Sequence, residues 1–213
     1  ARSPGTTSRG ASQPPDQTAA RPAHMDKDRL EPAAFAAPAV LLSGTVNQEM
    51  YRSFRSQLDA ARERDLVVVE LSTLGGDPEV ARMMGEDIRF HSTLAPSRRH
   101  VFLGKAAIYS AGTTFMSFFA RPNRYLTRGT RLMVHERKLD KQVKLNGPLT
   151  TCVAAVKAAL HEIETSIAIQ NEGFANLVEG SRVSLDEVLR RAPENWYIEA
   201  AEAQELGLIE AVL

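Results

Sequence analysis

The chain has 213 residues, 43% of them hydrophobic, with 26 basic and 26 acidic side chains and a single cysteine, Cys152. This length allows one substantial core but is too short for two typical domains and a linker. The balanced charge argues against nucleic acid and membrane surfaces as partners, and one cysteine excludes an intramolecular disulfide framework.

The first 38 residues are rich in Ala, Pro, Ser, Thr and Gly and hold few large apolar side chains. Such a composition cannot offset the entropy lost on ordering, so it predicts a flexible N-terminal extension over residues 1–38 and one domain over residues 39–213. The pair His24-Met25 fits either the end of a tag or an internal start, and both interpretations stay open. The lone cysteine and the lack of an apolar run of about 18 residues predict a soluble, cytoplasmic protein.

Short apolar runs predict strands at residues 40–42, 66–71, 101–103, 131–134 and 208–213. Apolar positions at helical spacing predict helices at residues 50–61, 77–88, 114–119 and 148–178, with two short helices after Ser184 and before Gly207. The β-branched run at 66–71 is typical of a strand covered on both faces, and the charged segment 136–147 should project from the core. This alternation predicts βαβ units and a mostly parallel sheet, whose strand ends collect ligands.

Three features that could take part in a reaction lie at or after predicted strands. Gly75-Gly76 follows one strand, Ser110 begins a helix among small residues, and His135 ends a later strand. A serine at a strand-to-helix turn exposes its hydroxyl, and the N–H of Ala111 would face an oxyanion together with an N–H of Gly75 or Gly76. His135 would accept the serine proton. Each feature alone has a plainer interpretation, because a serine there is usually an N-cap and a glycine pair is usually a turn.

The other histidines have no metal-like spacing with Cys152 or with a carboxylate pair; they are His24, His91, His100 and His161. We therefore expect no metal and no cofactor. The sequence also lacks a Gly-x-x-x-x-Gly-Lys-Ser/Thr phosphate loop, so any use of ATP would belong to a partner.

From residue 40 to residue 213 the chain resembles the Clp peptidase family, the proteolytic subunits that work with separate unfolding ATPases. Five motifs in the family's order carry the resemblance. They are Leu-Leu-Ser-Gly-Thr-Val at 41–46, Ser-Thr-Leu-Gly-Gly at 72–76 in place of Asn-Ser-Pro-Gly-Gly, Gly-Lys-Ala-Ala-Ile-Tyr-Ser-Ala-Gly at 104–112, Leu-Met-Val-His at 132–135, and Glu-Ala followed by Gly-Leu-Ile at 202–209.

The resemblance implies a Clp/crotonase-like α/β fold of stacked βαβ units, with a mostly parallel sheet and a long helix after the histidine strand. It implies a serine peptidase in which Ser110 is the nucleophile, His135 is the base, and the N–H groups of Gly75 and Ala111 form the oxyanion hole. It also implies a peptide or unfolded protein as substrate, a homo-oligomer and a separate ATPase partner.

The third catalytic position departs from the family. Counting back from the closing motif, the place of the family's orienting aspartate falls on Asn195, which Glu194 precedes. Three interpretations stay open: Asn195 orients His135, Glu194 turns in as the acid, or the site is impaired; we favour Asn195. Glu136 should point away from the site, because neighbouring strand residues face opposite ways.

Two further differences from the family are of length: the intervals from Gly76 to Ser110 and from His135 to Asn195 exceed the family's pattern.

Two other functions also stay open. A catalytically silent Clp-like subunit, with a structural or regulatory role, is favoured by Asn195, whereas the retained serine and histidine argue against it. A crotonase-type acyl-CoA enzyme would share the fold, but it gives no reason for a serine and a histidine at these two points.

Overall fold

A sheet of seven strands organises residues 29–213, the part of the chain that this computed structural model describes. Five strands lie side by side and pair in parallel, in the order β1 (Val40–Ser43), β2 (Leu66–Thr73), β3 (Arg99–Tyr109), β4 (Arg124–Leu126) and β7 (Ala211–Val212). β5 (Arg131–Val134) pairs in parallel with the end of β3, and β6 (Trp196–Glu199) pairs antiparallel with β5. The predicted mostly parallel sheet is confirmed.

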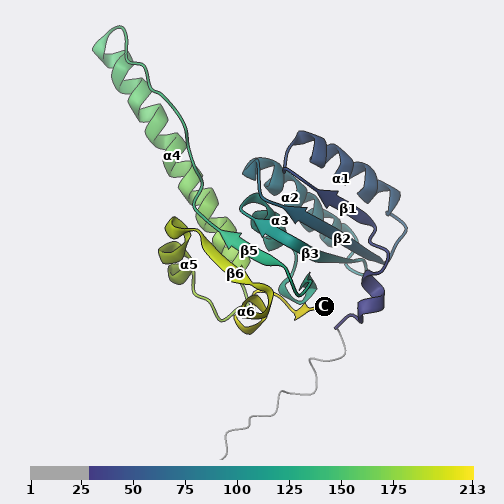
Figure 1. The fold of residues 1–213 in the computed structure, drawn as a ribbon. Coiled ribbons are helices and arrows are strands. Elements are labelled where there is room, and N and C mark those ends of the chain that lie inside the picture. Colours follow the sequence, from purple (N-terminus) through teal and green to yellow (C-terminus); the bar gives the residue numbers. More distant parts are fainter. Residues whose placement is uncertain (1–28) are drawn as a thin grey trace, which may run out of the picture.

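Three helices cover one face of this sheet, namely α1 (Gln48–Ala60), α2 (Pro78–Leu94) and α3 (Ala111–Ser117) (Figure 1). α2 begins as the sequence predicts, because the Asp77 side chain accepts the N–H groups of Glu79 and Val80 and Pro78 occupies the first turn. The core between helices and sheet contains edge-to-face aromatic contacts, among them Phe115 with Phe54 and with Phe119. The helix predicted at 114–119 begins earlier than expected, at Ala111, and ends at Ser117.

Part of the segment that the sequence predicted to be flexible packs on the other face of the sheet. A 3₁₀ helix, η1 (Pro32–Phe35), packs there and places the Phe35 ring 4.8 Å from the Tyr125 ring, beside Val68. Residues 29–38 thus include a packed segment where the sequence predicted a flexible extension, because Phe35 supplies an apolar side chain that is only 7% exposed. The rest of the predicted extension lies outside the described residues.

β3 is longer than the predicted strand at 101–103, because Gly104 does not end it. A Cβ at Gly104 would lie 2.4 Å from the Leu126 side chain, so the glycine permits close packing inside the strand. Beyond it the register with β2 shifts, since Leu71 pairs with Gly104 but Thr73 pairs with Ile108. At this irregularity β3 leaves β4 and joins β5, and the strand end comes to lie beside the histidine strand.

α4 (Leu149–Val178) projects from the body, and the chain between β5 and α4 runs alongside it (Figure 1). The predicted long helix and projecting segment are both present. The base of α4 is anchored by the Arg124 guanidinium, which is 2% exposed and donates hydrogen bonds to the carbonyl oxygens of Asn176 and Leu177 and to that of Phe119 after α3. A buried cation that is saturated with acceptors holds these chain ends together.

The C-terminal part wraps back onto the sheet through α5 (Leu185–Arg191), η3 (Ala192–Glu194) and α6 (Ala200–Glu205), while η2 (Arg121–Asn123) precedes β4. Ser184 caps α5 as predicted, by accepting the N–H of Glu187. The last strand is shorter than the predicted 208–213. Leu208 is buried in a turn after α6, where its N–H donates to the Ala203 carbonyl oxygen. No helix within residues 29–213 is both long and apolar enough to cross a lipid bilayer.

Candidate active site

Ser110 lies at the turn between β3 and α3, with φ of 53° and ψ of −112°. A positive φ is unusual for a residue with a Cβ, and such strain is typical of a serine that is displayed at a strand-to-helix turn. The Ser110 N–H donates to the Met133 carbonyl oxygen at 2.8 Å, which holds the turn against β5. The Ser110 side chain makes no capping hydrogen bond, so the plainer interpretation as an N-cap is wrong.

His135 follows β5 directly, and its Nε2 lies 2.6 Å from the Ser110 Oγ. The structure therefore brings together the serine and the histidine that the sequence singled out. Burial lowers the pKa of the half-buried His135 imidazole, and the nearby positive charge of Lys138 lowers it further. The neutral imidazole is favoured at neutral pH, and in the tautomer with a bare Nε2 it can accept the serine proton.

Gly75 lies against Ser110 and has a φ of 114°. A Cβ at Gly75 would lie 3.0 Å from the Ser110 Cβ and 3.5 Å from its Oγ, so only glycine allows this approach. Thr73, which the sequence reasoning did not single out, braces the turn, because its Oγ1 accepts the Gly75 N–H at 3.0 Å. The hydroxyl of a residue two positions before a tight glycine turn was the available signal.

Gly76 places its amide differently from Gly75. The carbonyl of Gly75 accepts the Val46 N–H at 3.0 Å, and the N–H of a trans peptide points away from its carbonyl. The Gly76 N–H, which belongs to the same peptide, therefore points away from Val46, and Gly76 lines the cavity beside Ser110. Within residues 29–213 no hydrogen bond engages the N–H of Gly76 or that of Ala111.

A cavity of about 270 Å³ opens beside the Ser110 and His135 side chains. Its apolar wall comes from Phe118, which directly follows α3, and from Phe174 and Leu177 at the base of α4. Sequence reasoning missed this wall, because nothing in the helical pattern of 148–178 indicates which turn meets Ser110. The cavity combines an apolar surface with a hydroxyl and an imidazole, a lining typical of a small-ligand site.

Asn195 lies near His135 along the sheet, because Trp196 pairs with Val134 across the antiparallel strands. Its backbone is left-handed, with φ of 58°, its side chain is exposed, and within residues 29–213 no hydrogen bond joins it to His135. Glu194 is also exposed. Glu136, expected to point away, lines the cavity with His135, because the chain is no longer a regular strand there. None of these three side chains is bonded to the imidazole.

The described residues hold no group of three or more His, Cys, Asp or Glu side chains that could bind a metal ion together. His100 is buried in β3, 3% exposed, and shares a hydrogen bond with Ser92. His91 lies beside His100, with ring centroids 6.3 Å apart. His24 lies outside the described residues.

No protein-family model matches the chain. Among solved structures, the chain is similar to an asparagine-to-aspartate mutant of ClpP1 from Listeria monocytogenes, with a TM-score of 0.64 and 18% sequence identity over 82% of this chain and 90% of that chain. At this identity the likeness shows the fold alone. The chain therefore has a Clp-like α/β fold, with a mostly parallel sheet and a long helix.

Gly75 is constrained both by its backbone conformation and by its close approach to Ser110. Gly75→Ala should lower the free energy of unfolding by about 1–3 kcal/mol, because it combines a strained φ with a contact on Ser110. Urea denaturation measures this change. The matched control is Gly129→Ala, since a Cβ at Gly129 meets nothing within 4 Å and should change stability by less than about 0.5 kcal/mol. Equal stability of the two variants would contradict the close approach.

Proposed function

We propose that the chain is a serine peptidase of the Clp type. The observation that supports this most is the 2.6 Å contact between the Ser110 Oγ and the His135 Nε2 at a strained strand-to-helix turn. Ser110 attacks a peptide carbonyl carbon while its proton passes to His135, and the resulting tetrahedral intermediate carries an oxyanion. His135 then protonates the leaving amine, and water hydrolyses the ester in a second, equivalent cycle.

The oxyanion needs two preorganised donors, and we assign one of them to the Ala111 N–H, as the sequence predicted. For the second donor the sequence favoured Gly75, but its N–H donates to Thr73 and would exchange that bond for one to the oxyanion. Among the described residues no acceptor engages the Gly76 N–H, which belongs to a residue that lines the cavity. We keep both glycines as candidates, with Gly75 also providing room for the serine.

A second function is favoured by a specific observation. In the described residues no side chain is bonded to the imidazole other than that of Ser110, so His135 lacks the orienting carboxylate of a full triad. A catalytically silent subunit in an assembly would fit this arrangement. Nothing in the acyl-CoA alternative accounts for the contact between serine and histidine.

We further propose that the protein is a homo-oligomer that assembles through α4. Its apolar side chains repeat every three or four residues and are between 41% and 84% exposed; they are Leu149, Val153, Val156, Leu160, Ile163 and Ile167. A stripe with this spacing is typical of a helix that packs against a partner. A peptide or an unfolded protein would be the substrate, and unfolding by ATP hydrolysis would fall to a separate partner.

The catalytic proposal is tested with a fluorophosphonate, which Ser110 attacks at phosphorus with loss of fluoride and transfer of the serine proton to His135. Mass spectrometry should locate the adduct on Ser110, and Ser110→Ala should abolish it, whereas Ser43→Ala at an exposed strand position should not. His135→Ala should slow labelling by at least about 10²-fold. The rate should rise with pH and level off before neutrality, because the lowered pKa of His135 leaves the imidazole neutral there.

The role of position 195 follows from the same assay. Faster labelling in Asn195→Asp would place Asn195 third in the triad, and an adduct that appears only in that variant would identify a silent subunit. A folded protein that is labelled in neither form would contradict the hydrolase proposal.

The assembly proposal predicts a change of mass in solution. Val156→Glu together with Leu160→Glu places two charges on the apolar stripe of α4 and should convert the oligomer to smaller species in light scattering. Ala158→Glu, an exposed position between them on another side of the helix, should leave the mass unchanged. An unaltered mass in the double variant, or a monomeric native protein, would contradict assembly through α4.

A further inference from the structure

The segment that carries His135 is bound beyond the sheet at Arg137 and, further along, by the ion pair of Lys141 with Glu162 on α4. β5 ends at Val134, and from there to Gly147 the chain forms no helix or strand. Arg137 anchors this segment twice, since its N–H donates to the Gln170 Oε1 at 2.7 Å and its Nη1 donates to the Glu79 Oε1 at 2.6 Å. Gln170 is itself only 9% exposed on α4, so the first of these bonds is sheltered from water.

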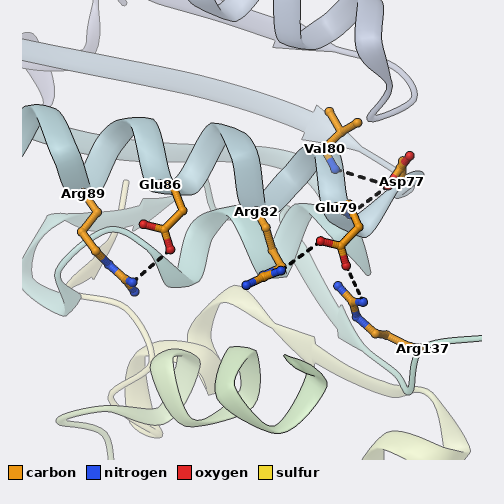
Figure 2. A network of polar contacts seen from close by, with 7 residues as sticks. All are labelled: Asp77, Glu79, Val80, Arg82, Glu86, Arg89 and Arg137. Carbon is orange, nitrogen blue, oxygen red and sulfur yellow. Dashed lines mark hydrogen bonds and ion pairs between the residues drawn. The ribbon is translucent and has the colours of Figure 1, made fainter. Parts of the chain in front are cut away.

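Glu79 lies on α2 between Pro78 and Arg82, two residues that line the cavity beside Ser110. It lies in the first turn of α2, three residues after Gly76, and its N–H donates to the Asp77 side chain at 2.8 Å. Figure 2 shows its carboxylate between Arg82 of the same helix and Arg137, which comes from the chain after β5. The second oxygen of Glu79 accepts from Arg82 at 2.9 Å, so both oxygens are engaged.

The ion pair joins the first turn of α2 to the segment that follows His135. Its side chains differ in exposure, with Arg137 at 19% and Glu79 at 51%. Burial alone would raise the pKa of the Glu79 carboxyl, but the hydrogen bonds from Arg137 and Arg82 outweigh this effect and hold that pKa below its usual value. The carboxylate is therefore ionised at neutral pH, and the contact persists there. An exposed pair of this kind adds little to stability, so its value lies in geometry.

We propose that Glu79 and Arg137 are positioning residues of the site, which hold the imidazole of His135 at hydrogen-bond distance from Ser110. The inference rests on the proposed function. The pair fixes the backbone two residues after His135 relative to α2, the helix that follows the Gly75-Gly76 turn. It thereby supplies part of the orientation that a carboxylate on the Nδ1 of His135 would give. Displacement of a catalytic group by about 1 Å can cost about 10²-fold in rate.

Glu79→Gln removes the charge of the acceptor and keeps its shape. It should slow fluorophosphonate labelling of Ser110 by roughly 10-fold to 10²-fold. Arg137→Met should do the same, whereas Arg137→Lys keeps the charge and should restore most of the rate. The matched control is Glu86→Gln on the same helix, because Glu86 pairs with Arg89 at 3.1 Å, is 52% exposed and lies further from the histidine segment (Figure 2). It should label within about 2-fold of the native protein.

A second readout does not depend on catalysis. NMR follows the pKa of the His135 imidazole. In Glu79→Gln this pKa should rise toward its usual value, because a loosened segment buries the ring less. Other charged side chains that line the cavity with His135 are unchanged in this variant; they are Arg82, Glu136, Arg137, Lys138 and Glu172. Glu86→Gln should leave the titration where it is, and both variants should melt within about 3 °C of the native protein.

The outcomes separate the two proposals. A native protein that is not labelled at Ser110 contradicts the proposed function, and the His135 titration then still decides whether the pair positions the ring. A native protein that is labelled, with Glu79→Gln equal to Glu86→Gln in both rate and titration, overturns the positioning role. Slower labelling without any change of titration, and without rescue by Arg137→Lys, overturns it as well.

Discussion

The hydrogen bond from the Ser110 N–H to the Met133 carbonyl, at 2.8 Å, is the contact on which the site depends. It exists because β3 changes partners along its length, pairing with β4 up to Gly104 and with β5 from Ala107. Ala106, with φ of 59°, lies at this change. Without it β3 would end beside β4, and the serine would be far from the strand that carries the histidine. One irregularity in a parallel sheet thus sets the distance between Ser110 and His135.

The strain at Ser110 is supported from three sides. α3 begins directly after Ser110 and buries Phe115 and Met116 in the core. Gly75, which has no side chain, leaves room for the Ser110 Cβ, and β5 accepts a hydrogen bond from the Ser110 backbone. Strained residues persist only where their surroundings determine them more strongly than local preference does. The base of α4 completes the arrangement, because Arg124 ties its last carbonyls to the end of α3 and so fixes the apolar wall of the cavity.

The serine and the histidine could be predicted from the sequence because each lies in a local motif at a strand end, and the order of the motifs defines which strands meet. The antiparallel strand β6 could not, because its apolar residues pair with β5 only once α4 has returned the chain to the sheet. Arg137 and Glu79 escaped notice for a similar reason. They are 58 positions apart, and neither has a local pattern that differs from an ordinary surface charge. Phe35 was missed because one aromatic residue in a stretch of small ones gives no periodicity.

Position 195 illustrates the limit of motif reasoning differently. Spacing from the closing motif placed Asn195 beside the histidine strand, and its neighbour Trp196 does pair with Val134. Spacing cannot say where the side chain goes, and here a left-handed backbone leaves it exposed. We therefore assign the orientation of His135 to the segment after it, which the ion pair between Glu79 and Arg137 binds to α2.

The most direct measurement is a crystal structure of the protein after reaction with a peptidyl phosphonate. The account predicts a bond from the Ser110 Oγ to phosphorus, with the phosphonyl oxygen within hydrogen-bond distance of the Ala111 N–H and of an N–H in the Gly75-Gly76 turn, and the peptide side chain in the cavity. A phosphonate attached to another residue, or an oxygen that faces away from both amides, would contradict it.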